Sequence, residues 1–223
     1  MANLLDELAI QYGTDKSSKH HNYTAWYFIL FNSIRLQPLK LVELGVFQAA
    51  SLKMWADFFP NAQLYGVDNK PEAAQYETER TKIFIGNQRD RRFLKKTAEL
   101  IGSPDIIIDD GGHRPEEQLD SLFALFPHLK DGGIYVIEDL QCSYLRRSYG
   151  FRAGLRNPFN TVEYLRRLLD VMHGEAGHGG LIGDEVSSRV QAVHFYPRIA
   201  FLFKGNPSPR LPGYKGKDLR RPG

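Results

Sequence analysis

Five short apolar runs alternate with segments of helical period along most of this chain, and this alternation limits the possible folds more than any other feature. The runs are rich in β-branched and aromatic residues, and we expect strands at 40–44, 63–67, 82–85, 105–109 and 133–138. Strands that alternate with helices favour a parallel sheet covered on both faces. Two later runs, 190–196 and 199–204, should pair as an antiparallel hairpin. The sequence predicts an α/β fold, with one doubly wound, mostly parallel seven-stranded sheet that ends in this hairpin.

Segments of helical period lie between these runs. We expect helices around 3–11, 23–35, 50–59, 90–100, 115–126 and 161–173, with a short one opened by Pro71. In the second helix one face is predicted to point inward, formed by Trp26, Ile29, Leu30 and Ile34. Residues 140–160 have no clear period and are long for a connection. Such a segment is typical of a lid or binding loop, or of an ordinary surface loop.

Length and composition limit the classes of protein to which this chain can belong. The 223 residues suffice for one domain, which we place at 1–205. No apolar run is long enough to span a membrane, the first residues do not resemble a signal peptide, and the single cysteine, Cys142, excludes an internal disulfide. We therefore expect a soluble, cytoplasmic protein that does not bind membranes. A homo-oligomer is compatible with these features.

The basic charge is concentrated at the C-terminal end. Residues 206–223 contain five Lys or Arg and one Asp, whereas the whole chain has a net charge of +3, so residues 1–205 have a net charge of −1. This Pro/Gly-rich tail is predicted to be disordered. A basic tail can bind nucleic acid, but no aromatic stacking pattern accompanies the charges, so nucleic acid is not the favoured partner.

The turn after the first strand argues against a dinucleotide site. That turn begins with Glu43, Leu44 and Gly45, and Phe47 and Ala50 replace the later glycines of a GxGxxG motif. An acidic strand end with one glycine suits a cationic ligand without phosphates, and S-adenosylmethionine is such a ligand.

The next two strand ends also carry polar groups. Asp68 ends the second strand and can accept both hydroxyls of a ribose. After the third strand, Asn87, Gln88 and Asp90 could contact an adenine edge, or could form a polar turn in which Asp90 caps the following helix.

Four carboxylates gather at the ends of the fourth and fifth strands: Asp109, Asp110, Glu138 and Asp139. So many negative charges repel one another unless a cation lies among them. A hard divalent cation such as Mg²⁺ or Mn²⁺ prefers carboxylate oxygens. His113 follows Asp110 by three residues and is placed to act as a base beside the ion. Each carboxylate alone could be a helix cap or a surface acid, but the set predicts a metal site.

Seven segments together resemble a known family: YGTDK (12–16), HNYT (21–24), LVELGVFQAASLKMW (41–55), YGVDNKP (65–71), DDGGH (109–113), EDLQCSY (138–144) and HFYPRIAFLFKG (194–205). They are similar to the metal-dependent sugar O-methyltransferases of bacterial antibiotic biosynthesis, of the mycinamicin VI 2″-O-methyltransferase type. The resemblance covers about 5–205. It implies a class I methyltransferase fold and S-adenosylmethionine-dependent, Mg²⁺-assisted methylation of a sugar hydroxyl on a glycoside acceptor.

The resemblance also implies roles for residues of this chain. Asp110, Glu138 and Asp139 would be the metal ligands, His113 would be the general base, and Asp109 would lie on the cofactor side of them. S-adenosylmethionine would be held by the segments around Glu43, Gly45, Asp68, Gln88 and Asp90. The N-terminal segment would cover it through Tyr12, Thr14 and Tyr23.

Three other functions stay open at this point. A catechol or another small diol could replace the sugar as acceptor. A second possibility is a non-catalytic binding module of the same fold, but unused clustered acids would destabilise it. The third, an NAD-linked enzyme, is disfavoured because the glycines are missing.

Overall fold

The computed structural model describes residues 3–145, 148, 153–173 and 184–205, and seven strands within these ranges form one sheet. The strands are β1 (Lys40–Leu44), β2 (Gln63–Asp68), β3 (Thr81–Ile85), β4 (Ile106–Asp109), β5 (Ile134–Ile137), β6 (Val190–Tyr196) and β7 (Ile199–Lys204). Their order in the sheet is β3-β2-β1-β4-β5-β7-β6. The first five strands are parallel, and β7 is antiparallel to both of its neighbours. The predicted architecture is confirmed.

The direction of winding reverses between β1 and β4. In the register of the sheet, Leu44 of β1 lies beside Val67 of β2 and beside Asp109 of β4. The turns that follow these parallel strands therefore emerge together at one edge. Sheets of this kind bind ligands in the crevice that opens where the strand order reverses.

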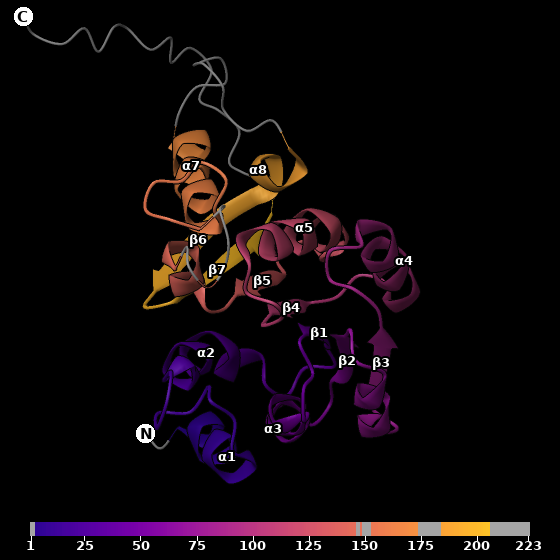
Figure 1. Ribbon diagram of the computed structural model, residues 1–223. Helices are drawn as coiled ribbons and strands as arrows, with labels where there is room; N and C mark the ends of the chain where they lie inside the picture. The colour runs from indigo at the N-terminus through magenta and orange to yellow at the C-terminus, as the bar shows by residue number, and fades with distance from the viewer. Residues whose placement is uncertain (1–2, 146–147, 149–152, 174–183, 206–223) are drawn as a thin grey trace, which may run out of the picture.

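Helices cover both faces of the sheet, as Figure 1 shows. One face carries α1 (Leu4–Tyr12), α2 (Tyr23–Phe31) and α3 (Ala50–Phe58), and the other carries α4 (Arg91–Ile101), α5 (Pro115–Leu125), α7 (Thr161–His173) and α8 (Glu185–Arg189). The connections include four short 3-10 helices: η1 (Asn32–Ile34), η2 (Pro71–Tyr76), η3 (Phe126–His128) and η4 (Leu140–Tyr144). The strands and helices that the sequence predicts are found within a few residues of their expected bounds.

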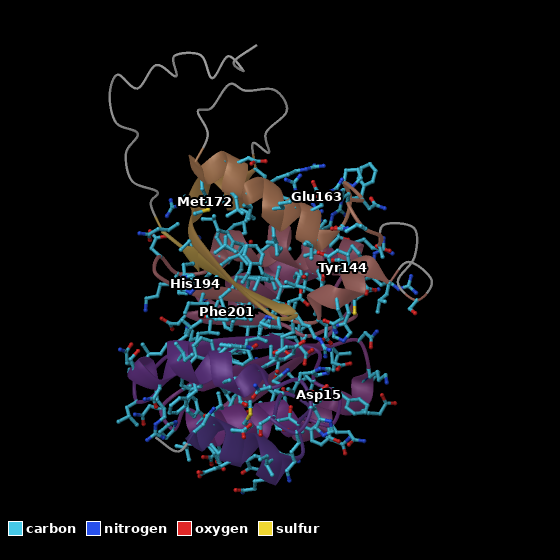
Figure 2. The ribbon with its side chains drawn as sticks, turned by 90° about the vertical axis from the view of Figure 1, so that its left-hand side faces the viewer. Asp15, Tyr144, Glu163, Met172, His194 and Phe201 are labelled. Atoms are coloured by element: carbon cyan, nitrogen blue, oxygen red, sulfur yellow. The ribbon has the colours of Figure 1, made fainter. Side chains whose placement is uncertain are left out.

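Two apolar layers hold the helices to the sheet. In β1 the side chain of Leu41 packs in the layer of α1–α3, and that of Val42 packs in the layer of α4, α5 and α7. Figure 2 shows side chains filling both layers, with Phe201 of β7 inside the molecule. Strands buried on both faces explain why the sequence has continuous apolar runs rather than alternating ones.

The inward face of α2 differs from the predicted one. Tyr23, Tyr27 and Phe31 are buried, whereas Ile29 is 63% exposed. The other predicted residues are partly buried against the same layer: Trp26, Leu30 and Ile34. The prediction of Ile29 as inward was wrong because this helix, YTAWYFILF, is apolar on nearly every side, and spacing alone does not single out a face. On the inward side, the ring of Tyr27 packs edge-on against Trp55.

The segment 140–160 is described only in part. Residues 146–147 and 149–152 of the predicted lid lie outside the described residues, and they include two aromatic residues and three arginines: Tyr149, Phe151, Arg146, Arg147 and Arg152. In the described part, Phe159 is 60% exposed, and Asn160 is buried and donates to the carbonyl of Gly154 at 2.7 Å. The lid stays a prediction. Among the described residues, no helix has the length and apolar character that a bilayer span requires.

Candidate active site

A cavity of about 560 Å³ lies at the carboxyl ends of the parallel strands. The turns after β1, β2, β3 and β4 and the segment after α1 form its walls, and the lining includes Thr14, Gly45, Asp68, Gln88, Asp110 and His113. Its position at the reversal of strand order and its volume suit a small-molecule ligand. Of the other residues that the sequence implicates, several lie outside the lining: Tyr12, Tyr23, Glu43, Asp90, Asp109, Glu138 and Asp139.

Gly45 allows the turns after β1 and β4 to approach closely. Its φ is +88°, and a Cβ atom at this position would lie 2.2 Å from the carbonyl oxygen of Asp110. Only glycine fits this position without moving the backbone. The turn after β1 therefore packs directly against the segment that carries Asp110 and His113.

Asp68 organises the same turn through its carboxylate. Oδ2 accepts backbone hydrogen bonds from Val46 and Phe47, both at 2.9 Å, and Oδ1 accepts one from Lys70 at 2.8 Å. A carboxylate has about four acceptor positions, so Asp68 can still accept from a ligand hydroxyl.

Gln88 connects the turns after β3 and β4. Its Nε2 donates to Asp109 Oδ1 at 2.7 Å, and its Oε1 accepts from the backbone of Gly112 at 2.9 Å. Asp109 is 1% exposed, and burial raises its pKa to about 6 against the opposing effect of the hydrogen bond from Ser121. Asp90 caps α4, and its Oδ1 accepts from the backbone of Arg92 at 3.0 Å. The residues of this region thus mainly position the loops around the cavity.

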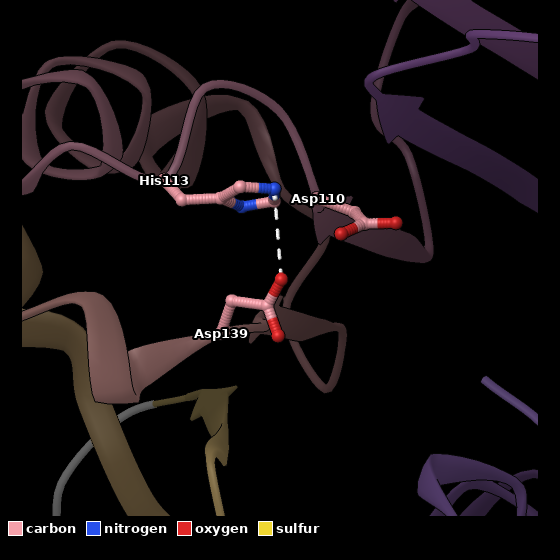
Figure 3. A group of neighbouring side chains, drawn as sticks. All are labelled: Asp110, His113 and Asp139. Carbon is pink, nitrogen blue, oxygen red and sulfur yellow. Dashed lines mark ion pairs between the residues drawn. The ribbon is translucent and has the colours of Figure 1, made fainter. Parts of the chain in front are cut away.

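Asp110, His113 and Asp139 form a compact group at the edge of the cavity (Figure 3). One ligand atom from each lies within 4.8 Å of the others. His113 Nε2 is 3.5 Å from Asp139 Oδ2, and the buried Nδ1 of His113 has no hydrogen-bond partner among the described residues. His113 and Asp139 both have positive φ, at 59° and 56°, which is a costly backbone conformation for these residues.

The chemistry of this group fits a divalent cation. Two carboxylates and an imidazole converge, their side chains are between 14% and 25% exposed, and a buried nitrogen lacks a partner. Burial raises the pKa of Asp110 despite the nearby charge of Lys16. Burial acts in the same direction on Asp139, but hydrogen bonds from Tyr23 and Gln141 outweigh it and lower the pKa of this carboxyl.

Glu138 lies deeper and is not part of this group. It is 1% exposed and accepts from Tyr27 Oη at 2.5 Å and from Lys16 Nζ at 2.9 Å. Lys16 is fully buried, contacts Asp110 as well, and lies 3.7 Å from Glu43. One lysine therefore faces the ends of three strands.

Glu43 forms the buried floor between β1 and α3. It accepts from Ser51 Oγ at 2.8 Å and from Trp55 Nε1 at 3.4 Å. Burial raises its pKa to about 7, although Lys16 acts in the opposite direction.

The N-terminal segment reaches the site at several points. Thr14 lines the cavity, and Tyr23 Oη donates to Asp139 at 2.6 Å. Tyr12 donates to Asp57 at 2.5 Å and lies outside the cavity lining.

Comparisons with known proteins agree with this geometry. The family described as a methyltransferase domain matches residues 42–140, which include most of β1, all of β2–β5 and the candidate metal group. The chain is 37% identical over 215 residues to the 8-demethyl-8-(2-methoxy-alpha-L-rhamnosyl)-tetracenomycin-C 3'-O-methyltransferase of Streptomyces olivaceus, covering 92% of this chain and 54% of the relative. The solved MycE methyltransferase from the mycinamycin biosynthetic pathway, in complex with Mg and SAH, matches with a TM-score of 0.87 at 30% identity. Residues 42–140 of this chain thus match a methyltransferase domain, and the fold of the chain matches that of MycE.

These matches extend over nearly all of this chain, but over only part of each relative. The match with the MycE structure covers 96% of this chain and 58% of the MycE chain. The mycinamicin VI 2''-O-methyltransferase of Micromonospora griseorubida is 34% identical over 90% of this chain and 52% of its own length. The chain thus spans about half the length of the curated relatives that it matches.

Two residues of this site were not predicted from the sequence. Lys16 and Tyr27 both bind Glu138, yet neither was assigned a role. The signal in the sequence was the excess of carboxylates at the strand ends, because these acids require a neighbouring cation. A lysine can supply that cation as well as a metal ion can. The YGTDK segment contains such a cation, but nothing local shows that it reaches the sheet.

Proposed function

We propose that this chain is a methyltransferase domain that transfers a methyl group from S-adenosylmethionine to a sugar hydroxyl of a glycosylated natural product, with help from Mg²⁺ or Mn²⁺. The observation that carries this proposal is the group of Asp110, His113 and Asp139 beside the cavity where the strand order reverses. The names of relatives support it, since they include methyltransferases of rhamnosyl and olivosyl compounds.

The cavity would hold the cofactor, which supplies the methyl group when bound. Gly45 gives it room to approach the backbone, Asp68 would accept one ribose hydroxyl, and Gln88 would contact the adenine from the turn after β3. Thr14 would close the cavity from the N-terminal side. Four further residues would support this site from outside the lining: Tyr12, Tyr23, Asp90 and Asp109. Glu43 would complement the positive end of the cofactor from the floor.

Asp110 and Asp139 would hold the divalent ion, with Glu138 as the third carboxylate. When bound, the ion would neutralise these acids and make a nearby acceptor hydroxyl more acidic. Glu138 could bind the ion through Oε2 only if its hydrogen bond with Lys16 were broken, because Nζ of Lys16 lies 2.9 Å from that oxygen.

His113 would remove the proton of the acceptor hydroxyl. Its side chain is 25% exposed and lines the cavity, and Asp139 lies beside Nε2 and orients the ring. General base catalysis of this kind is worth about 10²–10⁴-fold.

The acceptor is proposed as a sugar attached to a macrolide or an aromatic polyketide. The MycE complex with mycinamycin VI is the structural neighbour that supports this class. A cytoplasmic location, the absence of a nucleic-acid partner, and a single domain at 1–205 with a basic tail at 206–223 also belong to this proposal. A homo-oligomer is compatible with it.

Methyl transfer from radiolabelled S-adenosylmethionine to a panel of glycosides tests the proposal. Each glycoside is paired with its aglycone and with a simple catechol, and every reaction is run with Mg²⁺ and with a chelator. The proposal predicts labelled glycosides only, and only with the metal. Labelled catechol with unlabelled glycosides would assign the chain to non-sugar diols, and full activity in the chelator would exclude the metal site.

A further inference from the structure

Lys16 is a buried lysine surrounded by the acids of three strand ends. Its side chain has no solvent exposure, and it contacts Asp110 and Glu138 and lies 3.7 Å from Glu43. Lysine is almost never fully buried unless it is paired. Burial would lower its pKa, but the attraction of the three carboxylates prevails and raises that pKa well above the usual value. The ammonium is thus a fixed positive charge inside the carboxylate cluster.

The oxygens that Lys16 binds overlap with those of the candidate metal site. Asp110 belongs to the group that could hold a metal ion, and Asp110 Oδ2 is also a partner of Lys16 Nζ. Glu138 gives Oε2 to the same nitrogen at 2.9 Å. Two cations at contact distance from the same oxygens repel each other, and low exposure leaves that repulsion poorly screened.

We propose that Lys16 acts as a resident cation that competes with the divalent ion for Asp110 and Glu138. In the protein without metal, the ammonium neutralises these acids and keeps them in place. When the ion binds, Lys16 gives up its contact with them. This inference rests on the proposed metal site, and it assigns to Lys16 the role of a positioning residue that lowers metal affinity.

The position of Lys16 in the chain links this exchange to the cofactor cavity. Gly13, Thr14 and Asp15 precede it directly and line the cavity. The backbone of Lys16 accepts from Thr24 N at 3.1 Å, which ties the segment to α2. Release of the ammonium therefore acts on the wall that faces the cofactor.

Calorimetric titration with Mg²⁺, without substrates, tests the competition. Lys16→Met removes the charge and retains much of the length of the side chain, and it should bind Mg²⁺ at least ~10-fold more tightly than the wild type. Lys16→Arg keeps the charge and should stay close to the wild type. Lys204→Met is the matched control, because Lys204 is also buried but donates to the carbonyls of Pro127 and Leu129.

The possible outcomes separate this inference from the proposed function. If the wild type binds Mg²⁺ and Lys16→Met binds it no more tightly, the competition is wrong and the metal site stands. Binding by neither protein overturns both. Should Lys16→Met fold only when Mg²⁺ is present, the competition is supported, since the ion then replaces the missing charge.

A measurement on the wild type avoids any folding defect. The ammonium signal of Lys16 can be followed by ¹⁵N NMR and assigned by its loss in Lys16→Arg. Competition predicts that saturation with Mg²⁺ accelerates its proton exchange with water at least ~10-fold, because the ion displaces it from its buried partners. Unchanged exchange at saturation would overturn the inference.

Discussion

Tyr23 donates a hydrogen bond of 2.6 Å to Oδ1 of Asp139 and so joins α2 to the turn after β5. The other oxygen of Asp139 lies 3.5 Å from Nε2 of His113. Burial alone would raise the pKa of Asp139, but the bonds from Tyr23 and Gln141 hold it below its usual value. Helix α2 thus keeps a candidate ligand ionised and oriented.

Removal of the Tyr23 hydroxyl should weaken metal binding. We expect Tyr23→Phe to lower Mg²⁺ affinity by roughly 10-fold, because hydrogen-bond partners of ligands typically contribute that much. Tyr164→Phe is the matched control, since Tyr164 also donates to a carboxylate, Asp184, at 2.9 Å. Calorimetry should show wild-type affinity in the control, and an equal loss in both variants would contradict a local role for Tyr23.

The turn after β1 should not tolerate a side chain at position 45. Gly45→Ala would place a Cβ 2.2 Å from a backbone oxygen, so we expect loss of S-adenosylhomocysteine binding and a destabilisation of about 2 kcal/mol or more. Gly132→Ala is the comparison, because Gly132 lies outside the cavity lining and also has positive φ, but no atom lies within 4 Å of the added Cβ. It should cost only about 1 kcal/mol and keep the ligand. Equal affinities for S-adenosylhomocysteine in the two variants would refute this account of the turn.

His113 should affect turnover and not cofactor binding. We expect His113→Ala to lower kcat by ~10²-fold or more, with S-adenosylhomocysteine affinity within about threefold of the wild type. Partial recovery at raised pH is expected, since hydroxide can then take the proton. His128→Ala, in η3, should retain the wild-type rate. A normal kcat in His113→Ala would assign the proton transfer to another group.

Buried Glu43 should make stability fall as pH rises. Burial raises its pKa in the folded chain to about 7 from an ordinary value of 4.5. The folded chain therefore holds this proton to higher pH than the unfolded chain does, so the free energy of unfolding decreases between these two values. The decrease is roughly 3 kcal/mol for a shift of this size. Urea unfolding at pH 5 and pH 8 should show the slope in the wild type without metal and a smaller slope in Glu43→Gln, because Asp109 and Asp110, whose pKa values burial also raises, still contribute. Equal slopes in both would contradict the shift.

The strands and the doubly wound, mostly parallel sheet could be predicted because burial on both faces leaves a strong signal. Each parallel strand is a continuous apolar run, and the short separation of β6 and β7 required a hairpin. The rotation of α2 could not be predicted in the same way, because nearly all its residues are apolar. The contacts of Tyr23 and Tyr27 with carboxylates far along the chain, at Asp139 and Glu138, accompany its actual orientation.

The site could be located from the sequence, but its internal pairing could not. Acids at strand ends are visible as a pattern, and parallel strands bring their carboxyl ends to one edge. Which acid pairs with which partner depends on contacts between distant segments. Lys16 and Glu138 are 122 residues apart and meet at 2.9 Å, and no local feature of either indicates this.

A crystal structure with Mn²⁺ and S-adenosylhomocysteine tests the central claim most directly. The anomalous signal of Mn²⁺ locates the ion independently of any assumed ligands. The account predicts one strong peak within about 2.5 Å of carboxylate oxygens of Asp110 and Asp139, with S-adenosylhomocysteine in the cavity between Gly45 and Asp68. No peak at these carboxylates when S-adenosylhomocysteine is bound in the cavity would contradict the metal-assisted mechanism.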